Sequence, residues 1–184
     1  AANYNSPGQV VVSGNRKAVN KMIDLAKDAG AKRAILLPIS VPSHCVLMKN
    51  AANKFAELLN KIPFNDPVIP ILQNVDATVK TSCDQIKPIL IKQLYKPVQW
   101  VRTINTMYLL GVTNIIECGP SKVLSALIKR INLSYESPKR LFELFSIHDK
   151  SSLENTYADL KDIEFTALNL KNYNGTNTQV VTMK

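Results

Sequence analysis

Short apolar runs alternate with segments of helical periodicity along most of this chain of 184 residues. The runs rich in β-branched and other apolar residues predict strands, and they cover 9–13, 33–39, 68–75 and 114–118. Apolar residues at helical spacing cover 15–29, 46–61, 83–94, 98–110 and a stretch that follows Gly119-Pro120-Ser121 and ends near 131. Strands that alternate with helices indicate an α/β fold with a mainly parallel sheet.

Local signals mark several ends of these elements. Asn15 is a suitable cap for the helix 15–29, and Gly30 is a suitable stop. Pro70 lies inside the strand 68–75 and places it near an edge or a bulge. After Ser137 the alternation fades, and 153–160 predict one or two further helical turns. The polar segment 161–184 predicts a disordered tail, or sequence foreign to the domain.

The charge of the chain limits its partners. The net charge is +9, and the whole excess lies in the first 149 residues, where 19 basic residues face 10 acidic ones. Such a surface favours acidic partners: nucleic acid, phosphorylated ligands, anionic lipid or an acidic protein. The lysines are scattered without interleaved aromatic clusters, which argues against nucleic acid. No apolar run reaches the roughly 18 residues of a membrane helix, so we expect no membrane partner.

The cysteines and the first residues indicate the setting. Cys45, Cys83 and Cys118 are odd in number and far apart, with no C-x-x-C pair. We therefore expect neither a structural zinc site nor a disulfide framework, but reduced thiols in a cytoplasm. We also expect no signal peptide. The chain opens on Ala1 without an initiating Met and reads like the interior of a domain, which suggests a fragment.

His44 is the first candidate for chemistry. It lies just beyond the predicted strand 33–39, at the start of a connection to a helix. Loops that leave the ends of parallel strands carry the reactive groups of α/β folds. A neutral imidazole there can take a proton from a serine hydroxyl and return it to a leaving group. By position alone, a half-buried histidine bonded to backbone is an equal alternative. The neighbouring Cys45 is a poor nucleophile for His44, since adjacent residues point in different directions.

Five short blocks add a resemblance to a known family. They are NYNSPGQVV at 3–11, VPSHC at 41–45 with Leu47-Met48, QNVD at 73–76, QLY at 93–95 with PVQW at 97–100, and ECGP at 117–120 with KVL at 122–124. In this order and at about this spacing they resemble the bacterial malonyl-CoA:acyl carrier protein transacylases. The resemblance covers about 1–131, with a weaker match to about 160. Each block alone is weak, but five in register are specific.

The resemblance implies a fold and a domain organisation. Residues 1–39 would be the C-terminal part of a small ferredoxin-like subdomain. Residues 40–160 would be the C-terminal part of an α/β-hydrolase-like acyltransferase domain, and 161–184 the polar tail.

The same resemblance implies roles for single residues. His44 matches the family's general base, which activates a serine and later protonates the departing thiolate. Gln93 matches a position whose backbone carbonyl orients that histidine, the part an aspartate plays in a serine–histidine–aspartate triad. This leaves the Gln93 side chain dispensable. Asn5 and Asn74 match segments that line the cleft for the acyl group and pantetheine. The alternatives are a turn residue before Ser6-Pro7 for Asn5 and a strand end for Asn74.

Basic residues are candidates for docking the carrier protein. Lys32 and Arg33 would lie at the rim of the cleft, where they could steer the acidic acyl carrier protein. A solvated basic turn explains this pair equally well. Lys122, Lys129 and Arg130 pose the same choice, because basic residues also favour the C-terminal end of a helix.

The sequence departs from the family in its nucleophile. The G-x-S-x-G elbow is absent, and so is the Gly-Gln-rich loop that helps to build the oxyanion hole. No arginine aligns with the family residue that pairs with the malonyl carboxylate; the arginines are Arg16, Arg33, Arg102, Arg130 and Arg140. We expect all three features upstream of Ala1, so the chain would be a fragment without the nucleophile, inactive alone.

The function implied is transfer of a malonyl group from coenzyme A to the pantetheine thiol of acyl carrier protein, through a malonyl-serine ester. It belongs to bacterial fatty-acid synthesis in the cytoplasm and needs no metal or redox cofactor. The full-length family is expected to be monomeric. The alternative is a non-catalytic piece that binds acyl carrier protein or complements a separate N-terminal half.

Overall fold

The computed structural model describes residues 1–133 and 142–161. The chain divides into two compact units, Ala1–Trp100 and Val101–Lys184. The predicted tail therefore lies outside the described residues from 162 onward. The predicted domain boundary near residue 39 and the ferredoxin-like subdomain stay predictions.

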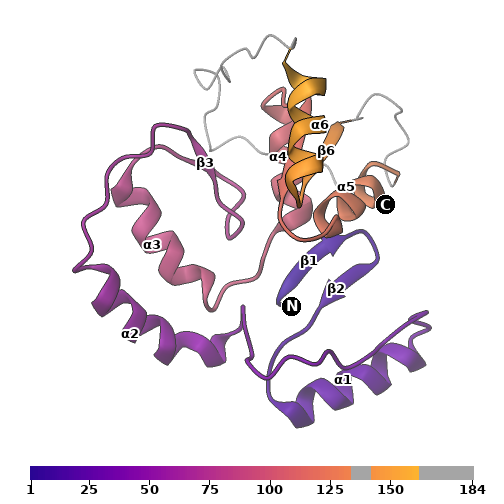
Figure 1. Cartoon of the computed structure of the whole chain (residues 1–184). Coiled ribbons are helices and arrows are strands. Elements are labelled where there is room, and N and C mark those ends of the chain that lie inside the picture. Colours follow the sequence, from indigo (N-terminus) through magenta and orange to yellow (C-terminus); the bar gives the residue numbers. More distant parts are fainter. Residues whose placement is uncertain (134–141, 162–184) are drawn as a thin grey trace. The chain divides into compact units, whose positions relative to one another are not determined.

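The first unit mixes short strands with helices. Its elements are β1 (Asn3–Ser6), β2 (Gln9–Val11), α1 (Arg16–Asp28), the 3₁₀ turn η1 (Val46–Met48), α2 (Lys49–Leu59), β3 (Ile71–Leu72), β4 (Val79–Lys80) and α3 (Cys83–Gln93). Strands β1 and β2 form an antiparallel hairpin, as do β3 and β4 (Figure 1). The residue Val98, which follows α3, returns beside β1 and exchanges backbone hydrogen bonds with Ala2 and Tyr4 at 2.8 and 2.9 Å.

Helix α1 begins and ends where the sequence predicts. The side chain of Asn15 accepts the Lys17 backbone N–H at 3.1 Å, which satisfies one of the free donors of the first turn. Gly30 follows the helix with a φ of +85°, a conformation that glycine adopts without a steric penalty. The predicted cap and stop are confirmed.

Helices α2 and α3 pack against each other and carry much of the core of this unit (Figure 1). Their buried apolar residues are Ala52 and Leu59 on α2 and Ile86 and Ile89 on α3. Burying a leucine or isoleucine side chain contributes about 1.5–3 kcal/mol. This contact holds the middle of α3 within the unit.

The predicted strand 33–39 is wrong. The segment has no strand partner among the described residues, and Ile35, Leu36 and Ile39 are 53%, 58% and 66% exposed. Pro38 removes one backbone donor, and the Ile39 N–H bonds back to the Leu37 carbonyl at 2.8 Å, which makes a tight turn. The strand predicted at 68–75 shortens to β3 for a related reason, since Pro70 precedes it.

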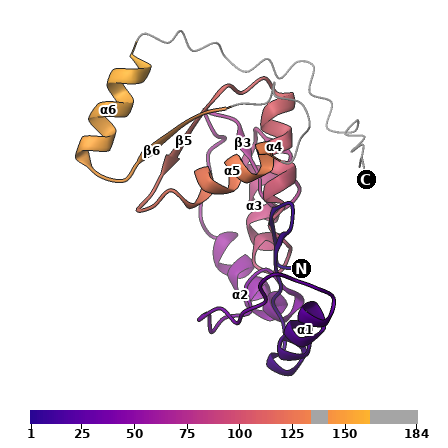
Figure 2. The same cartoon turned by 90° about the vertical axis from the view of Figure 1, so that its right-hand side faces the viewer.

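The second unit contains α4 (Trp100–Leu109, whose first residue ends the first unit), β5 (Asn114–Cys118), α5 (Val123–Leu133), β6 (Glu143–Ile147) and α6 (Lys150–Leu160). Strands β5 and β6 pair in parallel, from Asn114 opposite Glu143 to Cys118 opposite Ile147 (Figure 2). Helices α5 and α6 contact β6. The largest fully buried side chains, Ile104, Ile128 and Ile131, come from α4 and α5.

The mixture of helices and strands agrees with the predicted α/β class. A parallel pairing, however, occurs among the described strands only between β5 and β6. The sequence analysis missed β1, β4 and β6, while β5 and the helices were predicted close to their observed bounds. No helix in residues 1–133 or 142–161 has the length and apolar character needed to cross a membrane.

Candidate active site

His44 adopts an unusual backbone conformation just before η1. Its φ is +61°, in the left-handed region that costs a non-glycine residue roughly 1–2 kcal/mol. Two hydrogen bonds hold it there: the backbone N–H donates to the Leu94 carbonyl at 3.0 Å, and the ring Nδ1 lies 2.8 Å from the Gln93 carbonyl oxygen. Backbone strain of this kind at a half-buried histidine is typical of active sites and ligand-binding sites.

Both acceptors belong to the C-terminal end of α3. The last carbonyls of a helix have no partner within the helix and together carry about −0.5 of an elementary charge. Gln93 is the final residue of α3 and Leu94 its cap, so His44 supplies the partners that these two carbonyls lack. The end of the helix and the histidine therefore satisfy each other.

This contact fixes the tautomer of the ring. A carbonyl oxygen can only accept, so a hydrogen bond to Gln93 requires the proton on Nδ1. Nε2 of the neutral ring is then a proton acceptor. Within the described part of the chain Nε2 makes no hydrogen bond. The arrangement can take a proton from a hydroxyl or thiol presented to Nε2.

Asn74 joins the same group of residues. Its side-chain oxygen accepts a hydrogen bond from Nε2 of Gln93 at 2.7 Å, and its backbone carbonyl accepts the Gln99 N–H at 2.7 Å. Three of the residues singled out in the sequence thus form one hydrogen-bonded chain, which runs from Asn74 through Gln93 to His44.

The loop that carries Asn74 connects β3 to β4. The Gln73 N–H donates to the Thr78 carbonyl at 3.0 Å, and Ala77 turns the chain with a φ of +56°. Asp76 accepts the Thr78 N–H at 3.1 Å and pairs with Lys80 at 3.0 Å. Partial burial raises the pKa of Asp76, but hydrogen bonds from Thr78 and Lys80 outweigh burial and hold that pKa below its ordinary value. The sequence analysis did not identify these supporting contacts.

The other predicted site residues take no part in this hydrogen-bonded chain. Asn5 is half-buried in β1, at the register shift between Tyr4 and Ser6. Bulges of this kind re-aim side chains and are frequent beside active sites. Lys32 and Arg33 are exposed and follow α1 without regular structure.

Glu117, in the block ECGP, caps the start of α5. This buried residue of β5 accepts the backbone N–H groups of Leu124 and Ser125 at 2.9 and 2.8 Å and the Ser125 hydroxyl at 2.6 Å. Burial raises the pKa of Glu117, but the Ser125 hydroxyl and the N–H groups at the start of α5 outweigh burial and hold it low. The carboxylate is therefore ionised and fully engaged, which makes it a poor proton acceptor.

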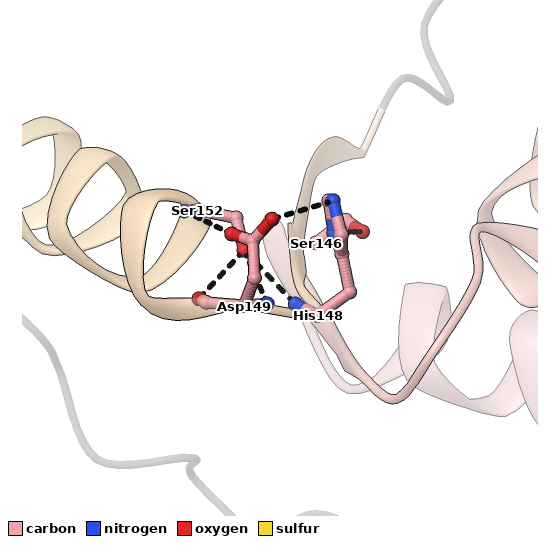
Figure 3. Close-up of polar contacts among 4 residues, drawn as sticks. All are labelled: Ser146, His148, Asp149 and Ser152. Carbon is pink, nitrogen blue, oxygen red and sulfur yellow. Dashed lines mark hydrogen bonds and ion pairs between the residues drawn. The ribbon is translucent and has the colours of Figure 1, made fainter.

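A second grouping has the residue types of a catalytic triad. Nδ1 of His148 lies 3.5 Å from the Ser146 hydroxyl and its Nε2 lies 3.6 Å from Asp149 (Figure 3). Both distances are too long for strong hydrogen bonds. Asp149 instead caps α6: it accepts the Ser152 N–H at 2.7 Å, while the Ser152 hydroxyl accepts the Asp149 N–H at 3.0 Å. This capping box gives the cluster a structural explanation.

No cluster of three or more His, Cys, Asp or Glu side chains in the described residues could hold a metal ion. Cys45, Cys83 and Cys118 are free thiols. The chemistry that the described geometry offers is proton transfer at His44.

Comparison with known proteins gives this geometry a context. No family model matches the chain. The malonyl CoA-acyl carrier protein transacylase of Escherichia coli is 52% identical over 129 residues, which are 70% of this chain and 42% of that protein. The Bacillus subtilis transacylase is 43% identical over 161 residues, 88% of this chain and 49% of that protein.

A solved structure agrees with these relatives. It is the holo complex PlMCAT:AntF, a type II polyketide-synthase acyl-carrier protein with its malonyl-transacylase. It matches with a TM-score of 0.79 at 41% identity, over 86% of this chain and 49% of that chain. The chain thus spans about half the length of the relatives it matches.

Proposed function

Because this chain is homologous to malonyl CoA-acyl carrier protein transacylases over about half of their length, we propose that it is the histidine-bearing part of such an enzyme. The enzyme transfers a malonyl group from coenzyme A to acyl carrier protein in fatty-acid synthesis. The observation that carries the proposal is the 2.8 Å contact between Nδ1 of His44 and the Gln93 carbonyl, which leaves Nε2 as a base.

The first half of the reaction uses a serine from the part of the transacylase that this chain does not match. Nε2 of His44 takes the serine proton while the serine oxygen attacks the thioester carbonyl of malonyl-CoA. The carbon–sulfur bond then breaks, and the imidazolium returns its proton to the coenzyme A thiolate. The Gln93 carbonyl and the negative end of α3 stabilise the transient imidazolium, as an aspartate does in a triad.

The second half repeats these steps with the carrier protein. Nε2 accepts the proton of the pantetheine thiol as its sulfur attacks the malonyl-serine ester. The ester bond breaks, the serine oxygen recovers a proton from the imidazolium, and malonyl-pantetheine leaves. The route is ping-pong, and none of its steps calls on a metal or a redox cofactor.

Carrier protein and coenzyme A are the partners in this proposal. The solved relative that binds an acyl-carrier protein supports it, as does the excess of basic over acidic residues. Lys32 and Arg33 are exposed, and in this proposal they would meet the acidic carrier protein at the rim of the cleft. Asn5, at the bulge of β1, would contact the acyl or pantetheine chain. Three free thiols suit the bacterial cytoplasm, where we place the enzyme.

A second candidate is a non-catalytic piece that complements another polypeptide. The observation that favours it is the exposed apolar segment 35–41, next to a helix α1 with no buried residue. Surfaces of this kind mark sites of protein contact.

One experiment separates the two. The chain is assayed for transfer of radioactive malonyl from coenzyme A to holo acyl carrier protein, first alone and then fused behind the unmatched part of the E. coli transacylase. We expect no transfer by the chain alone and clear transfer by this fusion enzyme. Turnover by the chain alone would mean that one of its own serines is the nucleophile. Binding of carrier protein with no transfer by a folded fusion enzyme would favour the non-catalytic piece.

A further inference from the structure

We propose that Asn74 is a positioning residue that aims the Gln93 carbonyl at His44. The inference rests on the proposed role of His44 as general base, and it gives the Gln93 side chain a function that the sequence left without one. Gln93 is held at both ends: its side-chain amide donates to Asn74 at 2.7 Å, and its carbonyl accepts from His44 at 2.8 Å.

The carbonyl needs such support because of its place in α3. Gln93 is the last helical residue, where the regular hydrogen-bond ladder stops and helix ends fray. The next residues turn irregularly: the Leu94 N–H reaches the Ile91 carbonyl at 3.4 Å and Tyr95 reaches Lys92 at 3.1 Å. A carbonyl at a loose end would sample several directions, and the His44 tautomer would then be less well defined.

Asn74 can supply that support because it is itself fixed. Its backbone carbonyl accepts the N–H of Gln99 at 2.7 Å, and Gln99 comes after α3 in the sequence whereas Asn74 comes before it. Its loop is closed by the backbone hydrogen bonds of Gln73 and by the Asp76–Lys80 pair. Gln73, the preceding residue, is 5% exposed. One side chain therefore ties the loop 73–78, the end of α3 and the connection that carries His44 into one unit.

The residue type fits this role. The side-chain oxygen of Asn accepts a hydrogen bond from Gln93, and Asp offers an oxygen at the same place. Leu has a similar size but no acceptor. Asn74→Leu should therefore break the contact, Asn74→Asp should keep it, and Gln93→Met should break it from the other side while leaving the backbone carbonyl in place.

The test reads the ring directly. Two-dimensional ¹⁵N spectra of the histidine rings, recorded on the full 184-residue chain with the imidazole neutral, report which nitrogen carries the proton. The chain has two histidines, so His148→Gln assigns the signals. We expect the Nδ1–H tautomer in the wild type and in Asn74→Asp, and a mixture of tautomers in Asn74→Leu and Gln93→Met. Asn53→Leu, at an exposed position of α2, is the control and should change nothing.

Kinetics of the fusion enzyme give a second readout. Asn74→Leu should lower kcat about ten-fold with little change in KM. This loss is smaller than the roughly 100-fold that misplacing a catalytic group can cost. The double variant Asn74→Leu/Gln93→Met should lose no more than either single variant, because both remove the same contact. Asn74→Asp should restore kcat.

The outcomes separate this inference from the proposed function. A His44 tautomer unchanged in both Asn74→Leu and Gln93→Met overturns the positioning role, even in an active enzyme. A shifted tautomer in a fusion enzyme that transfers no malonyl would keep the positioning role and count against the proposed function. If Asn74→Leu fails to fold, Gln93→Met carries the test, since it leaves the loop 73–78 intact.

Discussion

The Gln93 carbonyl oxygen lies 2.8 Å from Nδ1 of His44, and the adjacent Leu94 carbonyl accepts the backbone N–H of the same histidine at 3.0 Å. The end of α3 thus orients the His44 ring through Nδ1, the ring atom that a carboxylate contacts in a catalytic triad. The partner is a dipole rather than a full charge, so it orients the ring at a smaller desolvation cost than a buried aspartate. This orienting effect depends on geometry, because a carbonyl dipole that points away from Nδ1 does not orient the ring.

The first prediction concerns His44 itself. In the fusion enzyme, His44→Ala should lower the rate of malonyl-serine formation at least about 1,000-fold, as loss of the base does in triad enzymes. The measurement is the burst of labelled protein with malonyl-CoA in the absence of carrier protein. Ser146→Ala and His148→Ala are matched controls, since their cluster serves to cap α6, and both should acylate normally. A His44→Ala variant that acylates at near the wild-type rate would remove His44 from the mechanism.

The sequence predicted the residues of this site that lie in short contiguous motifs. His44 and Gln93 stand in short motifs, and their contact follows from the family those motifs resemble. The Asn74–Gln93 hydrogen bond spans 19 positions and depends on a loop closed by Asp76 and Ala77, so no local pattern indicates it. Asn74 was accordingly interpreted as a cleft residue, with a residue at a strand end as the alternative.

The fold shows the same division. Strand β5 and the capped helix α1 follow from local signals and were predicted correctly. The segment 33–39 was predicted as a buried strand because apolar sequence reports a preference for burial, not the presence of a covering surface. Strand β6, in contrast, is held by its parallel pairing with β5, and its own sequence gave too weak an alternation to be recognised.

The second prediction concerns docking of the carrier protein. Reversing both charges with Lys32→Glu/Arg33→Glu should raise the KM for acyl carrier protein about ten-fold at low salt, because steering by complementary charge accelerates association by that order or more. Acylation by malonyl-CoA alone should not change. The difference should shrink as salt is added.

The matched control for this prediction is Lys17→Glu/Lys21→Glu, an equal change of charge on the exposed surface of α1. An equal rise in the KM for acyl carrier protein in this control would mean that net charge, and not the basic pair after α1, governs carrier binding. No change in either variant would leave Lys32 and Arg33 as a solvated turn.

The third prediction concerns Glu117 and acid stability. The pKa of Glu117 is held below its ordinary value in the folded chain. Its stabilisation is therefore present above the unfolded-state pKa of about 4.3 and is lost as the pH falls through the lower folded pKa. Glu117→Gln should destabilise the second unit by about 1.5–3 kcal/mol at neutral pH, as expected for hydrogen bonds to a charged group.

This prediction is checked by urea unfolding of wild type and Glu117→Gln between neutral pH and about pH 3, a range that spans the ordinary carboxyl pKa. The free energies of unfolding of wild type and Glu117→Gln should converge in acid, because protonation of Glu117 removes the extra stability of the wild type. Glu143→Gln, at an exposed position of β6, should run parallel to the wild type. A constant difference between Glu117→Gln and wild type across the whole pH range would show that the ionised form is not what stabilises α5.

The last prediction concerns the exposed apolar segment 35–41. Leu36 and Ile39 are 58% and 66% exposed in a chain that spans about half of its relatives, and we expect the unmatched part of the transacylase to cover them. An exposed patch of this kind promotes aggregation when it stays uncovered. In the isolated chain, Leu36→Asp/Ile39→Asp should lower binding of the dye ANS and reduce self-association in analytical ultracentrifugation.

In the fusion enzyme the same change should lower the Tm, because charges would then be buried without partners. Val68→Asp, at a side chain that is 99% exposed, is the matched control and should leave the Tm of the fusion enzyme unchanged. Equal tolerance of the Leu36→Asp/Ile39→Asp change in both settings would show that the segment faces solvent in the complete enzyme as well.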